Sequence, residues 1–143
     1  ELVFDQGLGD IFSIRTAGNV MGDYELGSIE YAVEHLDCKL VVVMGHKDCG
    51  AIKAFITSKG HYEHLDHIKK IIEYIESEQE EKDLENHHEL NLDKAIDANI
   101  AHGVTFLKTA EPILKEFHET KKVDIVGAIY DIETGKVTFN KTN

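Results

Sequence analysis

The chain has 143 residues, is 42% apolar and carries a formal net charge of −12 at pH 7. This length fits one domain with its own core, and the apolar fraction is ordinary for a globular protein. The charge argues against nucleic acid as a partner, because phosphate binding needs a basic face and no Lys/Arg cluster stands out. The longest apolar runs are far shorter than a membrane span, so we expect no membrane partner.

The first half of the chain alternates between predicted strands and helices, a pattern typical of a parallel sheet with helical crossovers. A short strand is predicted over residues 11–15. Apolar side chains then repeat at helical spacing over residues 26–36, which predicts an amphipathic helix leading into a buried strand at 40–44. A helix is expected to begin at residue 51, and a second amphipathic helix is expected over residues 65–75.

The second half continues the alternation after an acidic interruption. Residues 76–89 are acidic and poor in apolar side chains, which predicts a solvated helix end and loop. A long helix is predicted from residue 92 to 107, and Pro112 marks a break or a fresh start after it. A strand over 123–132 and a turn lead into a last strand at 137–139. The predicted fold class is therefore α/β, with a mostly parallel central sheet flanked by helices and a C-terminal hairpin strand.

The segment Gly45-His46-Lys47-Asp48-Cys49-Gly50 joins the buried strand to the next helix. With two residues between them, the imidazole of His46 and the thiolate of Cys49 can converge on one ion. Gly45 and Gly50 are expected to let the backbone turn tightly on either side. Two ligands do not hold zinc, because a catalytic site has three protein ligands and an exchangeable position. On spacing alone, a satisfied histidine beside a small buried thiol is the commoner arrangement.

The residues around this turn resemble the β-class carbonic anhydrases, in which a strand–Gly-His-x-x-Cys-Gly–helix element supplies two zinc ligands. Four further segments are similar to that family in the expected order, including an Arg-x-Ala-Gly-Asn motif and a closing strand with its hairpin: residues 1–12, 14–20, 27–36 and 126–137. The resemblance covers nearly the whole chain and is weakest between residues 60 and 92.

This resemblance implies a zinc enzyme that catalyses the reversible hydration of CO₂ to bicarbonate and a proton. It implies Zn²⁺ as the cofactor, with His46 and Cys49 as ligands, and CO₂ or bicarbonate as the substrate. It also implies a homodimer or a higher homo-oligomer. It places four residues in the substrate pocket: Ala17, Gly18, Asn19 and Gly50. An ordinary strand-ending turn is the alternative for the first three.

One part of the family pattern does not occur in these 143 residues. In the family, a Cys-x-Asp-x-Arg motif on the first strand, shortly before the position of Glu1, supplies another zinc thiolate and an Asp–Arg dyad. No catalytic residue is therefore assigned on this chain. We expect a single domain over residues 1–143 that lacks its N-terminal helical arm and first strand, both present in the working molecule. A catalytically inactive carbonic-anhydrase-like subunit or interaction module, without a complete zinc site, is the alternative.

The cysteine count and a group of histidines leave further hypotheses open. Two cysteines suggest reduced thiols in a cytoplasmic compartment, with Cys38 as a small, partly buried core residue. A redox or sensor role for Cys49 would require a lowered thiol pKa without bound metal. His61, His64 and His67 recur at three-residue spacing and could bind a transition metal adventitiously, although we favour a solvated or interface role for them.

Overall fold

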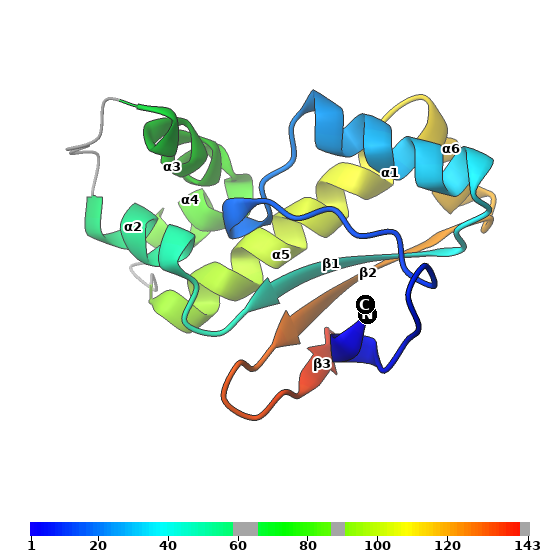
Figure 1. Cartoon of the computed structure of the whole chain (residues 1–143). Helices are drawn as coiled ribbons and strands as arrows, with labels where there is room; N and C mark the ends of the chain where they lie inside the picture. The colour runs from blue at the N-terminus through cyan, green and yellow to red at the C-terminus, as the bar shows by residue number, and fades with distance from the viewer. Residues whose placement is uncertain (59–65, 87–90, 141–143) are drawn as a thin grey trace.

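The structure, a computed structural model shown in Figure 1, describes three stretches of the chain: residues 1–58, 66–86 and 91–140. Two short 3-10 helices come first, η1 (Leu2–Phe4) and η2 (Ala17–Asn19). The α-helices within these stretches are α1 (Asp23–His35), α2 (Gly50–Ser58), α3 (His67–Ser77), α4 (Gln79–Asn86), α5 (Leu92–Thr109) and α6 (Ile113–Glu119). Four of them, α1, α2, α3 and α5, confirm predicted helices, and α6 begins directly after Pro112.

The sheet in the described part of the chain has the strand order β1–β2–β3. Strand β1 (Leu40–His46) pairs in parallel with β2 (Asp124–Tyr130), and β2 pairs antiparallel with β3 (Val137–Phe139). In the β1–β2 register His46 lies opposite Tyr130, so both strands end at the same edge of the sheet. Figure 1 shows this edge with α2 following β1 and a loop following β2. The predicted α/β class and C-terminal hairpin strand are confirmed.

Helix α5 lies directly on the sheet because two strand positions have no side chain. A Cβ atom at Gly45 of β1 would lie 2.8 Å from Ile100 Cδ1, and one at Gly127 of β2 would lie 2.8 Å from Ile100 Cγ2. Ile100, on the side of α5 that faces the two strands, is fully buried. This close approach fixes the C-terminal end of β1. No helix in the described stretches is both long and apolar enough to cross a membrane.

The predicted strand over residues 11–15 is wrong. The segment is neither helix nor strand, and the described sheet has no strand paired with it. Phe12 is 46% exposed and Ile14 is 38% exposed, so their apolar side chains are not sealed into a sheet face. Aromatic and β-branched residues favour a strand only where a neighbouring strand completes the hydrogen-bond ladder.

The prediction that residues 76–89 form a solvated helix end and loop is also wrong for the residues that the structure describes. Helix α4 forms there and packs against α5. Glu78 is 1% exposed and Glu81 is fully buried, in spite of their charged side chains. Composition could not reveal this, because the packing of α5 over the stretch decides which of its carboxyl groups are covered.

Candidate metal centre

His46 is the last residue of β1 and Cys49 directly precedes α2, so a single turn carries both side chains. The backbone of Asp48 makes this turn, with a left-handed φ of 63° that a short polar side chain tolerates. The prediction that Gly50 provides the turn is wrong. Gly50 is the first residue of α2, is not left-handed, and a Cβ there would meet nothing within 4 Å. Gly45 serves the contact with α5 instead.

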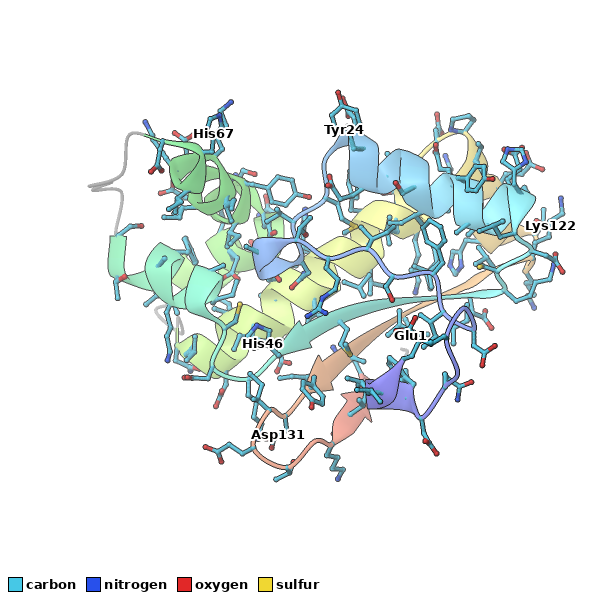
Figure 2. The ribbon with its side chains drawn as sticks, in the orientation of Figure 1. Glu1, Tyr24, His46, His67, Lys122 and Asp131 are labelled. Carbon is cyan, nitrogen blue, oxygen red and sulfur yellow. The ribbon has the colours of Figure 1, made fainter. Side chains whose placement is uncertain are left out.

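The geometry of His46 leaves one ring nitrogen available to bind a ligand. Its Nδ1 lies 2.9 Å from the carbonyl oxygen of Lys47. A carbonyl oxygen can only accept, so this bond places the proton on Nδ1 and leaves the lone pair of Nε2 open. Metal-binding histidines characteristically anchor their second nitrogen in this way. Figure 2 shows His46 at the tip of β1.

The second predicted ligand, Cys49, is 4% exposed and forms no disulfide. It lies where β1 has just ended and the first turn of α2 begins, and its carbonyl oxygen accepts from Lys53 N–H at 3.0 Å. Its position is therefore fixed by helix geometry. Together, His46 and Cys49 provide donors of the kind that zinc prefers, one imidazole and one thiol.

The predicted pocket residue Gly18 packs against the start of α2. Its φ is 66°, and a Cβ atom there would lie 3.0 Å from the Ala51 Cβ and 3.2 Å from Ile75 Cδ1. Ala51 comes two residues after Cys49, so the structure brings the η2 loop to the same turn that carries the predicted ligands. A side chain at position 18 would prevent the loop from coming this close to α2, which explains the need for glycine.

The two residues beside Gly18 differ in their surroundings. Ala17 is exposed, whereas Asn19 is partly buried and has a left-handed φ of 43°. The side-chain nitrogen Nδ2 of Asn19 is buried and has no hydrogen-bond partner in the described part of the chain. Buried amide donors are normally satisfied, so this nitrogen is a donor still available at the loop.

A residue that sequence reasoning missed, Asp131, lies beside the turn. It follows β2 as Lys47 follows β1, and its carboxylate lies 3.1 Å from Lys47 Nζ. Figure 2 shows it in the loop after β2, below His46. The hydrogen bond from Lys47, supported by the backbone N–H groups of Thr134 and Glu133, lowers the pKa of Asp131. The rule that neighbouring parallel strands end at one edge could have predicted this pairing.

A cavity of about 250 Å³ opens at this edge and has a mixed but mainly acidic lining. The carboxylate of Asp48 forms an ion pair with Lys53 and is 73% exposed. The lining residues come from the turn, the start of α5 and the loop after β2: Lys47, Asp48, Leu92, Asp93, Asp131, Ile132 and Glu133.

The other candidate ligands do not form a competing centre in the part of the chain that the structure describes. His61 and His64 lie outside the described residues, and His67, at the start of α3, is remote from His46 in Figure 2. Cys38 is free and partly buried, as predicted. Among the described residues no group of three or more His, Cys, Asp or Glu side chains could hold a metal ion. A zinc ion at His46 and Cys49 therefore needs a further ligand from elsewhere.

The fold and this turn define an α/β protein in which a parallel strand ends in a histidine and a cysteine directly precedes the next helix. The family model described as carbonic anhydrase matches residues 1–137. The chain therefore belongs to the β-class carbonic anhydrase family.

Individual relatives agree with this assignment. A carbonic anhydrase of Mycolicibacterium smegmatis is 57% identical over 58 residues, which cover 41% of this chain and 28% of that protein. A carbonic anhydrase of Synechococcus elongatus is 30% identical over 146 residues, covering 95% of this chain and 53% of that protein. The structure of a Coccomyxa β-carbonic anhydrase in complex with acetazolamide matches with a TM-score of 0.84 at 25% identity, over 96% of this chain and 64% of that one. The chain thus spans about half or less of these two curated relatives.

Proposed function

We propose that this protein catalyses the reversible hydration of CO₂ to bicarbonate and a proton, with Zn²⁺ as its cofactor. The observation that carries the proposal is the turn from β1 to α2, on which His46 has its proton on Nδ1 and Cys49 has a buried thiol. These are donors of the right kind for zinc. Family membership supports the class of reaction, and the donors on the turn support the proposed position of the zinc ion.

The proposed ligands on this chain are His46, through Nε2, and Cys49, through Sγ. A catalytic zinc site has three protein ligands, so we propose that a third, a thiolate on a Cys-x-Asp-x-Arg segment, is supplied in the working molecule from outside these 143 residues. When bound, zinc would lower the pKa of a coordinated water molecule to about 7, which makes a nucleophile for CO₂ available at neutral pH. Residues 1–143 would then form one domain of that molecule.

The remaining residues of the turn and the η2 loop would position these groups. The Lys47 carbonyl keeps the His46 ring in the tautomer that can bind a metal. The buried Nδ2 of Asn19 is suited to donate to an oxygen atom of CO₂ or bicarbonate. Gly18 keeps its loop against α2, and Ala17 and Gly50 complete the proposed pocket.

We also propose a homodimer or a higher homo-oligomer, and a cytoplasmic location. Two β-carbonic anhydrases of Sordaria macrospora, which share the fold at a TM-score of 0.79 and 18% identity, are described as tetrameric. Two free thiols fit a reducing compartment. Light scattering after size-exclusion chromatography of the protein tests the assembly: a monomer at micromolar concentration would contradict it.

The function is tested by zinc content and CO₂ hydration of the complete protein. The variants are His46→Ala and Cys49→Ser, and Cys38→Ser is the matched control because it removes the other cysteine of these residues. After dialysis against a weak chelator, we expect about one zinc per chain in the parent protein and the control. Both ligand variants should lose zinc and activity together. Zinc should also dissociate as the pH falls, because the thiolate must be deprotonated to bind.

Two results would contradict this proposal in different ways. Zinc content near zero in the parent protein would favour the inactive carbonic-anhydrase-like subunit. Full zinc content and activity in Cys49→Ser would show that the metal is held elsewhere.

A further inference from the structure

A buried carboxyl group lies at the junction of three helices. Glu78 is the residue between α3 and α4, and its side chain is 1% exposed. Both of its carboxyl oxygens face the side-chain nitrogen of Asn99 on α5, at 3.0 and 3.3 Å. Asn99 is itself 2% exposed. This contact joins the α3–α4 turn to the central helix from within the core.

The surroundings of Glu78 are unfavourable to a negative charge. Burial, followed by the nearby carboxyl group of Glu81, raises the pKa of Glu78 to about 9, against the opposing effect of the Asn99 hydrogen bond. Glu80 raises it further. From α3, the Tyr74 phenol also faces this region, and burial and Glu78 raise its pKa.

Two nitrogen-bearing side chains of α4 and α5 have partners other than Glu78 in the described part of the chain. On α5, His102 Nδ1 lies 2.9 Å from the Glu80 carboxylate. On α4, Lys82 Nζ donates to the Ser77 carbonyl at 2.8 Å. Helix η2, which also packs against α3, has no ionisable side chain. Among the residues that the structure describes, Glu78 thus meets an amide donor and further carboxyl groups.

We propose that Glu78 is a proton-dependent latch between the α3–α4 turn and α5. In its neutral form, the carboxyl group accepts from Asn99 without placing a charge in the interior. When it loses its proton, a negative charge is left in the interior opposite Glu81, and the turn and α4 loosen from α5.

The latch is connected to the η2 loop through the last turn of α3. Ile75, three residues before Glu78, packs against Gly18, and the Tyr74 phenol forms a hydrogen bond with the Met21 backbone. Loosening at Glu78 should therefore also reduce protection of the backbone near Met21. The latch does not rest on CO₂ chemistry, because its readouts are structural.

The direction of the pH effect follows from the pKa of the Glu78 carboxyl in the folded and in the unfolded chain. The glutamate carboxyl has a pKa of 4.5 in the unfolded chain, whereas the pKa of Glu78 in the folded chain is about 9. Between these values the folded state binds one more proton than the unfolded state. Stability should therefore fall as the pH rises through this window, and this contribution should be level below and above it.

The test compares the complete protein with Glu78→Gln, which keeps an oxygen that can accept from Asn99 but cannot ionise. Hydrogen exchange, corrected for the intrinsic rate, and thermal unfolding are measured from pH 5 to pH 10. In the parent protein, amide protection in α4 and near Met21 should fall by up to about tenfold per pH unit across the window. In Glu78→Gln it should not fall, and the melting temperature of the variant should exceed that of the parent by an amount that grows with pH.

The matched control is Glu73→Gln on α3, where the carboxylate is 48% exposed and pairs with Lys69. It should follow the parent protein. The proposal is overturned if Glu78→Gln keeps the pH dependence of the parent. A carbon-13 titration of the parent protein gives an independent answer if the variant folds poorly: a Glu78 carboxyl that ionises below pH 6 contradicts the latch, and one that ionises near pH 9 supports it.

Discussion

The turn around His46 and the latch around Glu78 are both polar sites, but their partners lie at very different distances along the chain. His46 bonds to the carbonyl of the next residue, and Asp48 pairs with Lys53. Glu78 and its partner Asn99 are separated by 21 residues. The turn is therefore organised mainly by local sequence, and the latch only by the docking of one helix on another.

The same difference appears in how carboxyl groups ionise. The exposed Glu111 has a lowered pKa because Lys115, one helical turn away, bonds to it at 2.7 Å. The buried Glu78 has a raised pKa because water is excluded and another carboxyl group is near. Residue type alone does not predict even the sign of the shift, since burial raises the pKa of Glu78 whereas the nearby Lys115 lowers that of Glu111.

The first prediction challenges the view that the turn is purely local. In Gly45→Val the new side chain would collide with Ile100 of α5, and overpacking of this kind should lower the free energy of unfolding by about 3 kcal/mol. Urea unfolding measures the change. Gly50→Ala is the matched control at the other end of the turn: space there is open and alanine favours a helix, so its stability should be unchanged or about 0.5 kcal/mol higher. Equal losses in both variants would contradict the assignment of Gly45 to the α5 contact.

The second prediction concerns the loop that touches both regions. Gly18→Ala must adopt a left-handed φ and press on Ala51 and Ile75, so it should lose about 2 kcal/mol of stability. Ile75→Val shortens one of the two contacting side chains. In a double-mutant cycle, the pair should therefore lose less than the sum of the single variants. Strict additivity would show that Ile75 does not press on position 18.

The third prediction tests the long-range partner of the latch. Asn99→Ala removes the donor to Glu78 and leaves a buried carboxyl group unsatisfied. This should lower the free energy of unfolding by about 1.5 kcal/mol. Chemical denaturation at pH 7 measures it. Thr105→Ala, also on α5, is the control because its exposed hydroxyl donates to the Ala101 carbonyl of the same helix. Its change should stay within about 0.5 kcal/mol, and an Asn99→Ala loss no larger than this would remove Asn99 from the latch.

The smallest expected effect is a shift in the titration of Glu111. In Lys115→Met its pKa should rise toward 4.5, because the hydrogen bond and the positive charge are lost. The sign is opposite to that at Glu78: the small stabilisation from Glu111 is present above pH 4.5 and disappears as the pH falls through the lowered pKa. Carbon-13 NMR of the glutamate carboxyl groups follows both residues in one experiment. Movement of Glu78 in Lys115→Met would mean that the two sites are not independent.

Local sequence was sufficient for several features of the molecule. The β-branched run before Gly45 predicts β1, the spacing of apolar residues predicts α1, α3 and α5, and Pro112 predicts the new start at α6. The His46–Cys49 spacing, next to a strand and a helix, indicated the candidate metal centre. These features depend on chain direction and side-chain periodicity, which are properties of neighbouring residues. The roles of His46, Cys49 and the η2 loop stay predictions until zinc is measured.

Only the tertiary structure decided the features that depend on a distant partner. Residues 11–15 have the side chains of a strand, but a strand needs a neighbour to share its hydrogen bonds. The stretch that contains Glu78 and Glu81 has the composition of a solvated loop, yet both side chains are buried where α4 packs on α5. Asp131 comes beside Lys47 only because β1 and β2 end at the same edge of the sheet. In each case, burial and pairing arise from segments that are remote in sequence, and these set both the structure and the charge state of the side chain.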